Sequence, residues 1–208
     1  MIEHTIKWRV KHFCTKWCPT LYFLIKYSRA ARRLGGMELR QREAFRLFLS
    51  NAAKQEACLQ IGVKDEFGGK FGANWVSVDK YDTRPFIDFQ QDVQSLQFED
   101  DRFGAIACIA VLEMVEDPQR AIQELYRVLK PGGEIWIQLP FNFPYMGGTD
   151  KTLRDYWRAS PDGLRLWMRG FEEICCGNFQ HVRSSLVNST FYYGRKPQKE
   201  CDSGSLQE

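Results

Sequence analysis

Apolar positions between residues 103 and 139 change their spacing twice along the chain. Residues 103–110 and 134–139 are short apolar runs with little room for an exposed polar face, which is typical of parallel strands covered by helices on both sides. The segment between them repeats apolar side chains at helical spacing: Ala121, Ile122, Leu125, Val128 and Leu129. The pattern predicts a strand, a helix and a second strand parallel to the first.

The ends of this helix follow from local chemistry. Asp117 suits the N-cap, because its carboxylate can accept a hydrogen bond from a backbone N–H of the first turn, and Pro118 suits the first helical position. Residues 130–133 read Lys-Pro-Gly-Gly, a sequence that must end the helix. Arg127 lies near that end, where a cation complements the helix dipole.

Shorter patterns predict the other elements. Residues 38–53 have helical periodicity, and Ser160 followed by a proline is a typical helix start. We expect strands at residues 57–61, 75–79, 171–176 and 189–193, and helices at residues 38–53 and 161–168.

Basic residues are concentrated near the N-terminus. Residues 1–42 carry ten Lys and Arg against two Asp and Glu, although the net charge of the whole chain is only +3. This segment also contains six aromatic side chains: Trp8, Phe13, Trp17, Tyr22, Phe23 and Tyr27. We interpret it as a helical arm covering the domain or a partner subunit, or as a contact with an anionic membrane surface through residues 1–35. Nucleic acid is the weakest interpretation, since no recognised nucleic-acid module accompanies the charge.

The chain has 208 residues, enough for one domain with a sizeable core. Its seven cysteines show no spacing typical of a disulfide framework or a zinc site, so we expect no metal and a reducing cytoplasm. We also expect no secretory signal, and the apolar run at residues 21–25 is too short to cross a bilayer. The expected location is cytoplasmic, with peripheral membrane contact as an open alternative.

One long segment resembles a known family. Residues 90–141, which include "LEMVEDPQRAIQELYRVLKPGGEIWIQLPF", resemble the second half of the class I S-adenosylmethionine-dependent methyltransferase domain, of the methyltransferase type 11 kind. The resemblance extends more weakly from residue 57 to residue 194. It implies a doubly wound α/β fold of the Rossmann-like methyltransferase type, with a mostly parallel seven-stranded sheet and one antiparallel strand near the C-terminus. The expected organisation is a helical N-terminal extension at residues 1–53, the methyltransferase domain at residues 54–195 and a disordered tail at residues 196–208.

The resemblance also implies a set of residues that bind S-adenosylmethionine. An acid at the end of the second strand, Asp79, can accept hydrogen bonds from both ribose hydroxyls, and Asp92 would meet the adenine amino group. Ordinary surface or turn aspartates remain the alternative interpretation of both. The full expected set is Gly62, Val63, Asp79, Lys80, Asp92, Val93 and Ala110.

The loop after the first strand departs from the family pattern. Related sequences alternate glycines there, which lets the backbone approach the cofactor without a Cβ in the way. This chain keeps Gly62 but continues with Val63, and its next glycines begin only at Gly68. Either the loop folds differently around the same cofactor, or binding is weakened or lost.

No general base can be assigned from the sequence. Related methyltransferases often carry His where this chain has Met114, and the three histidines, His4, His12 and His181, have no local catalytic signature. Loops at the carboxyl ends of parallel strands bind ligands in open α/β sheets. On that ground, and by resemblance, we expect the acceptor to be bound by Tyr145, Arg154, Tyr156 and Arg158, although Asp155 and Arg158 could instead pair locally.

The sequence therefore predicts a methyltransferase that uses S-adenosylmethionine and acts on a small-molecule or glycan-type acceptor. The alternative is a catalytically degenerate methyltransferase-like binding or scaffold protein, which the altered Gly62 loop and Met114 would suit. A nicotinamide-dependent dehydrogenase fits less well, because Gly62 does not open a G-x-G-x-x-G turn.

Overall fold

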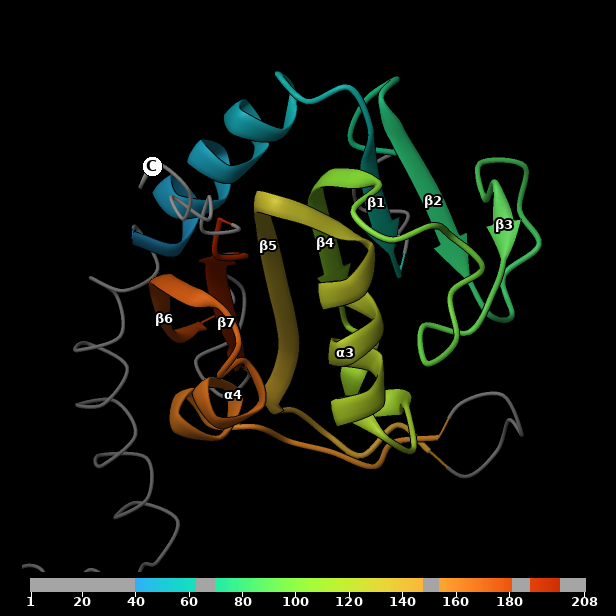
Figure 1. The fold of residues 1–208 in the computed structure, drawn as a ribbon. Coiled ribbons are helices and arrows are strands. Elements are labelled where there is room, and N and C mark those ends of the chain that lie inside the picture. The colour runs from blue at the N-terminus through green and yellow to red at the C-terminus, as the bar shows by residue number, and fades with distance from the viewer. Residues whose placement is uncertain (1–39, 63–69, 148–153, 181–187, 199–208) are drawn as a thin grey trace, which may run out of the picture.

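The computed structural model describes residues 40–62, 70–147, 154–180 and 188–198 (Figure 1). Its centre is a seven-stranded sheet with the strand order β3-β2-β1-β4-β5-β7-β6. Strands β1 to β5 pair in parallel, whereas β7 is antiparallel to both of its neighbours. The strands are β1 Cys58–Ile61, β2 Trp75–Asp79, β3 Phe89–Gln90, β4 Phe103–Ile109, β5 Leu129–Asn142, β6 Glu172–Gln180 and β7 Asn188–Arg195.

Helices cover both faces of this sheet. Helices α3 (Pro118–Val128) and α4 (Pro161–Trp167) pack on one face, and a helix over residues 40–52 packs on the other. Figure 1 shows α3 in front of β4 and β5. The expected doubly wound, mostly parallel α/β fold is confirmed.

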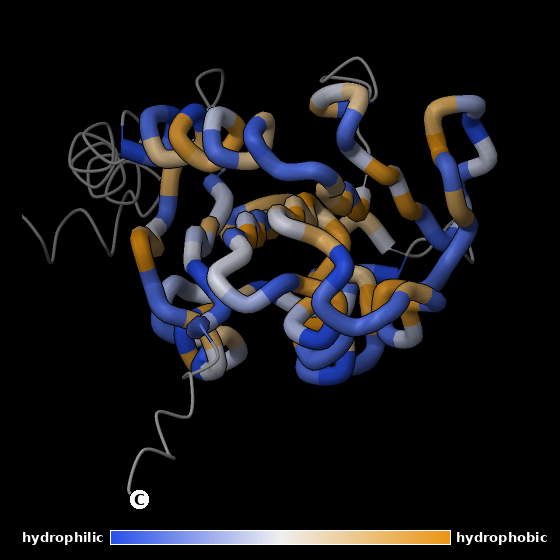
Figure 2. Tube along the Cα trace, turned by 45° about the horizontal axis from the view of Figure 1, so that its top comes forward, coloured by the Kyte–Doolittle hydropathy of each residue, from blue (hydrophilic) through white to orange (hydrophobic). Residues whose placement is uncertain are grey.

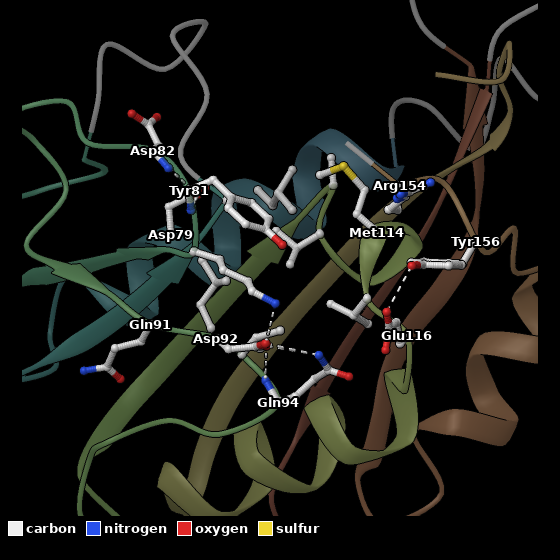
Figure 3. Close-up of a pocket in the computed structure, with 18 of the residues that line it drawn as sticks. Asp79, Tyr81, Asp82, Gln91, Asp92, Gln94, Met114, Glu116, Arg154 and Tyr156 are labelled. Atoms are coloured by element: carbon white, nitrogen blue, oxygen red, sulfur yellow. Dashed lines mark hydrogen bonds and ion pairs between the residues drawn. The ribbon is translucent and has the colours of Figure 1, made fainter. Parts of the chain in front are cut away.

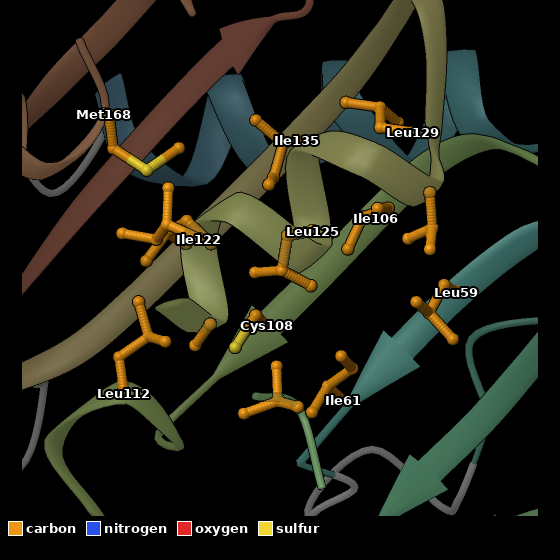
Figure 4. Packing of buried hydrophobic residues seen from close by; sticks show 14 of the residues in the cluster. Leu59, Ile61, Ile106, Cys108, Leu112, Ile122, Leu125, Leu129, Ile135 and Met168 are labelled. Carbon is orange, nitrogen blue, oxygen red and sulfur yellow. The ribbon is translucent and has the colours of Figure 1, made fainter. Parts of the chain in front are cut away.

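Alternate residues of the central strands enter two separate cores. In β4, Ile106 and Cys108 join the core under α3, whereas Ala105 and Ala107 face the helix over residues 40–52. All seven residues of β4 are buried. Figure 4 shows the core under α3, where Leu125 lies among side chains of β4 and β5, and Figure 2 shows hydrophobic colour concentrated along the central strands. Burial on both faces explains the continuous apolar run in the sequence.

The second core is rich in aromatic side chains. Trp136 of β5 stacks on Phe191, with ring centroids 5.2 Å apart, and its ring lies 6.0 Å from that of Phe48. The small side chains of Ala105 and Ala107 on the neighbouring strand belong to the same core, which leaves space for these large rings.

Both predicted helix starts are confirmed. The Asp117 carboxylate accepts a hydrogen bond from the Arg120 backbone N–H at 3.0 Å, and Pro118 begins α3. Ser160 caps α4 in the same way, through a 3.1 Å hydrogen bond from the Gly163 N–H. Helix α3 ends at Val128, as expected just before the Lys-Pro-Gly-Gly sequence, but β5 already begins at Leu129, so residues 130–133 belong to this strand rather than to a separate turn.

The N-terminal boundary that we predicted at residue 54 is too late. Phe48 is fully buried in the second core, and Asn51 donates hydrogen bonds to the buried Glu134 carboxylate at the start of the regular part of β5. The helix over residues 40–52 is therefore part of the domain rather than of an extension. Leu47, which the helical pattern also included, is 52% exposed. Residues 1–39 lie outside the described residues.

The C-terminal boundary also differs. We expected disorder from residue 196, but Lys196 is buried, and its ammonium group donates hydrogen bonds to Asp101 and to the backbone oxygens of Tyr126 and Leu129. The described chain continues to residue 198, and the remaining tail lies outside it. Among the described residues, no helix is both long enough and apolar enough to cross a membrane.

Neighbouring residues of the helix over residues 40–52 provide a matched test of its place in the domain. We expect Phe48→Ala to lower the free energy of unfolding by about 3–5 kcal/mol, because it leaves a cavity among packed rings. Leu47→Ala should change it by about 0.5 kcal/mol or less, because that side chain is largely in solvent. Urea denaturation measures both changes. If Phe48→Ala lowered the free energy of unfolding as little as Leu47→Ala, the helix would lie outside the cooperative core.

Candidate functional site

A cavity of about 800 Å³ opens at the carboxyl ends of β1, β2 and β4. Parallel strands direct their carboxyl ends to one edge of the sheet, which is where open α/β folds bind ligands. Six of the seven residues expected at the cofactor line this cavity: Gly62, Asp79, Lys80, Asp92, Val93 and Ala110. The seventh, Val63, lies outside the described residues, as does the altered loop that begins with it.

Gly62 holds the turn after β1 close to the end of β4. Its φ of +75° is a left-handed conformation that favours glycine. A Cβ at this position would lie 2.4 Å from the Ile109 carbonyl oxygen and 2.4 Å from Val111 Cγ2. Ala110 also has a positive φ, of 54°, which is uncommon for a residue with a Cβ. The backbone is therefore tightly folded on two adjacent strand ends at the edge of the cavity.

Asp79 ends β2 and organises the turn that follows. Its Oδ1 atom accepts hydrogen bonds from the backbone N–H groups of Tyr81 and Asp82, both at 2.9 Å. Among the described residues no hydrogen bond reaches its second carboxylate oxygen, Oδ2. Figure 3 shows Asp79 and Tyr81 on one side of the cavity. The turn thus fixes the carboxylate while leaving one oxygen for a ligand.

Asp92 is held by several donors. The Lys80 ammonium lies 2.8 Å from Asp92 Oδ2, and Gln94 donates to the carboxylate through its backbone N–H at 2.9 Å and its side-chain amide at 3.2 and 3.3 Å (Figure 3). Burial raises the pKa of the Asp92 carboxyl, but Lys80 and Gln94 outweigh burial and hold the pKa below its ordinary value. The hydrogen bond to Asp92 in turn raises the pKa of Lys80.

Two loops that are distant in the sequence are joined at the mouth of the cavity. The backbone N–H groups of Tyr156 and Trp157 both donate to the Glu113 carbonyl oxygen, at 2.8 and 3.1 Å. The Trp157 indole N–H donates to the Val115 carbonyl at 2.8 Å, and the Tyr156 hydroxyl donates to the Glu116 carboxylate at 3.2 Å. Glu113 is itself fully buried, in the 3-10 helix Leu112–Met114 that follows β4. These bonds fix the acceptor-side loop to the end of β4.

The four expected acceptor residues divide into two pairs. Arg154 and Tyr156 line the cavity. Tyr145 is 72% exposed and Arg158 forms an ion pair with the buried Asp155 carboxylate, and neither belongs to the cavity lining. Their role in acceptor binding therefore stays a prediction that their positions do not support.

Several cavity residues were missed by the sequence analysis. Tyr81 and Asp82 lie two and three residues after Asp79, so the sequence could have indicated them as part of the same loop. Gln94 and Glu116 carried no signal, because their positions in the cavity depend on contacts between separate loops. The polar lining residues found only from the structure include Tyr81, Asp82, Arg84, Gln91, Gln94 and Glu116.

Metal-binding groups are scarce in the part of the chain that the structure describes. There, no group of three or more His, Cys, Asp and Glu side chains is arranged to hold a metal ion. Its four cysteines, Cys58, Cys108, Cys175 and Cys176, are free thiols. The three histidines lie outside the described residues.

The fold and the cavity define a doubly wound α/β domain with a ligand site at its strand ends. The family described as "Methyltransferase domain" matches residues 70–137. A demethylmenaquinone methyltransferase of Renibacterium salmoninarum is 36% identical over 80 residues, which are 38% of this chain and 33% of that protein. A thiol S-methyltransferase of Rattus norvegicus is 24% identical over 80% of this chain and 78% of that protein. Together these matches support a class I S-adenosylmethionine-dependent methyltransferase domain.

A solved structure agrees with this fold. The N-methyltransferase NodS of Bradyrhizobium japonicum, in complex with S-adenosyl-L-homocysteine, has a TM-score of 0.56 and 18% identity, and the match covers 76% of this chain and 86% of NodS. The chain spans a third or less of the length of the first curated relatives that it matches.

The Asp155–Arg158 ion pair should stabilise the acceptor-side loop in a pH-dependent way. Asp155 also accepts a hydrogen bond from the Met146 N–H at 3.0 Å. We expect Asp155→Asn to lower the free energy of unfolding at pH 7 by about 1–3 kcal/mol, because Arg158 loses its charged partner. Denaturant titration at several pH values measures the loss.

The sign of the pH dependence follows from the pKa of Asp155. The hydrogen bond from Arg158 holds this pKa below 3.8, so the contribution to stability is present above pH 3.8 and is lost as the pH falls through the lower folded-state value. The difference between wild type and Asp155→Asn should narrow toward pH 3. Asp162→Asn is the control, because its i,i+3 pair with Arg165 is exposed and should contribute little. A difference that is constant with pH would contradict the assignment.

Proposed function

We propose that this domain binds S-adenosylmethionine and transfers its methyl group to a small-molecule or glycan-type acceptor. The observation that carries the proposal is the convergence of Gly62, Asp79 and Asp92 on one cavity at the carboxyl ends of three parallel strands. Its volume of about 800 Å³ lies within the usual range for ligand and cofactor pockets.

Features of the described residues fit this cofactor. Gly62 has no Cβ where the backbone turns at the cavity edge, and Asp79 presents a carboxylate oxygen that can accept ribose hydroxyls. Asp92 carries a charged carboxylate suited to a purine amino group. The residues therefore have the right chemistry for adenosine at one end of the cavity.

The chemistry requires alignment more than acid–base catalysis. When bound, the cofactor supplies a methyl group on a sulfonium, and its transfer is an in-line displacement that mainly needs an aligned acceptor and the exclusion of water. The fixed loop that carries Tyr156 can provide the alignment, because it is hydrogen bonded to the end of β4. Glu116, bonded to the Tyr156 hydroxyl, is the carboxylate at that side of the cavity.

The mouth of the cavity suits a polar acceptor. Tyr81 and Tyr156 expose 53% and 45% of their surfaces there, and Arg154 and Glu116 add one charge of each sign. Exposed rings beside charged groups can bind sugar rings or other polar small molecules through both apolar faces and hydrogen bonds. This composition supports the proposed acceptor class.

A degenerate binding or scaffold protein is the second candidate. It is favoured by Met114, an apolar side chain that lines the cavity where related enzymes often carry His. Cofactor binding without methyl transfer to any acceptor in a broad screen would favour this candidate.

The test of cofactor binding is thermal unfolding with S-adenosylhomocysteine. Ligand at about 100 times its dissociation constant stabilises by about 2.7 kcal/mol, which for a domain of this size raises Tm by about 5–10 °C. We expect Asp79→Ala to abolish the shift. Asp79→Asn should retain part of it, because the amide oxygen can still accept the Tyr81 and Asp82 N–H groups that form the turn.

Asp162→Ala is the matched control for this experiment. Asp162 is an exposed carboxylate of α4 outside the cavity lining, so the ligand-induced shift should equal that of wild type. No shift in wild type at millimolar ligand would reject cofactor binding, and a full shift in Asp79→Ala would reject the ribose role.

We further propose that residues 1–35 attach the domain to an anionic membrane surface. The support is the basic and aromatic composition of that segment. Deleting residues 1–35 should abolish co-sedimentation with phosphatidylserine vesicles at low salt. A variant in which the eight Lys and Arg of this segment become Gln should behave like the deletion, and sedimentation that survives either change would contradict the proposal.

A further inference from the structure

Lys80 is the first residue after β2, and it lines the cavity. Its ammonium group lies 2.8 Å from Asp92 Oδ2, and Figure 3 shows Asp92 beside Gln94 among the cavity residues. Both residues line the space proposed for the cofactor. The Lys80 side chain is 48% exposed and that of Asp92 is 26% exposed. The ion pair therefore occupies part of the ligand site rather than the core.

The Asp92 carboxylate has little remaining capacity to accept hydrogen bonds. Oδ1 accepts the Gln94 backbone N–H and its side-chain amide, and Oδ2 accepts the same amide together with Lys80. A carboxylate offers about four acceptor positions. A further donor, such as the amino group of adenine, must therefore replace one that is already present.

The two donors to Asp92 differ in how easily they can be displaced. Gln94 is held at two other points, because its Oε1 accepts the Asp117 N–H at 2.9 Å and its carbonyl oxygen accepts a hydrogen bond from Arg120 Nε at 2.9 Å. Lys80 has a flexible stem, and its ammonium also lies 5.3 Å from the centre of the Tyr81 ring. The Tyr81 ring and the solvent around this half-exposed side chain offer the ammonium alternative partners.

We propose that Lys80 is a built-in competitor for the adenine amino group at Asp92 and thereby sets the affinity for the cofactor. The inference rests on the proposed function, since it assumes that adenosine binds in this cavity. Cofactor binding exchanges an ion pair for a hydrogen bond instead of adding a hydrogen bond to a vacant carboxylate. Lys80 acts through Asp92 and is therefore a residue that tunes specificity for the 6-amino purine.

The test measures binding of two ligands to two variants by calorimetry. One ligand is S-adenosylhomocysteine, and the other is its analogue in which hypoxanthine replaces adenine, so that an oxygen replaces the amino group. Lys80→Met keeps the apolar stem and removes the ammonium. We expect it to bind S-adenosylhomocysteine about two- to fivefold more tightly, as expected for removal of a partly exposed ion pair. The affinity for the hypoxanthine analogue should increase less or not at all.

Two comparisons separate this role from a general effect of charge. Lys70→Met is the matched control, because Lys70 forms a similar ion pair with Asp88 outside the cavity lining and should leave both affinities unchanged. Lys80→Arg keeps the cation and should stay close to wild type. High salt should bring the affinity of wild type for S-adenosylhomocysteine closer to that of Lys80→Met, because salt screens the partly exposed ion pair between Lys80 and Asp92.

The outcomes are distinct. Weaker binding by Lys80→Met, or equal tightening for both ligands, would overturn the competitor role while leaving the proposed function intact. Binding by Lys80→Met but not by wild type would support the role strongly. Absence of binding in both proteins would overturn this inference together with cofactor binding.

Discussion

The burial of β4 on both faces is the constraint on which the rest of the structure depends. A strand with no exposed face needs a helix layer on each side and a strand on each edge, and β4 has all four neighbours. Because β1, β2 and β4 run parallel, their carboxyl ends meet at one edge of the sheet. The cavity is therefore a consequence of core packing rather than a separate feature.

The two ends of the cavity are held by different means. The end that carries Tyr156 is fixed by backbone and indole hydrogen bonds to Glu113 and Val115. At the other end, the carboxylates of Asp79 and Asp92 are oriented by nearby donors. A loop that is fixed through its backbone allows the side chains at the mouth to vary without loss of the fold, and such loops are where one fold acquires different functions.

Local signals predicted much of the fold, and long-range contacts account for what they missed. The strand over residues 75–79 and the caps at Asp117 and Ser160 were correct, because adjacent residues determine them. The helix over residues 40–52 was assigned to an extension, because helical periodicity does not indicate which distant residue a helix contacts. In the structure, Phe48 of this helix packs near the Trp136 ring. In the site, the resemblance and the strand ends indicated most of the residues that line the cavity near Asp79, whereas the ion pair between Lys80 and Asp92 required the folded chain.

The hydrogen-bond donors that Asp79 and Asp92 already have limit how much affinity each carboxylate can add for a ligand. A ligand group that meets an already satisfied carboxylate gains only the difference between two hydrogen-bonding arrangements, which is smaller than the value of either one. Asp79 keeps an oxygen available and should contribute most of the affinity, whereas Asp92 should contribute mainly to selection among purines. On this proposal a change at Asp79 should alter affinity alike for all purines, whereas a change at Asp92 or Lys80 should alter affinity by an amount that depends on the base.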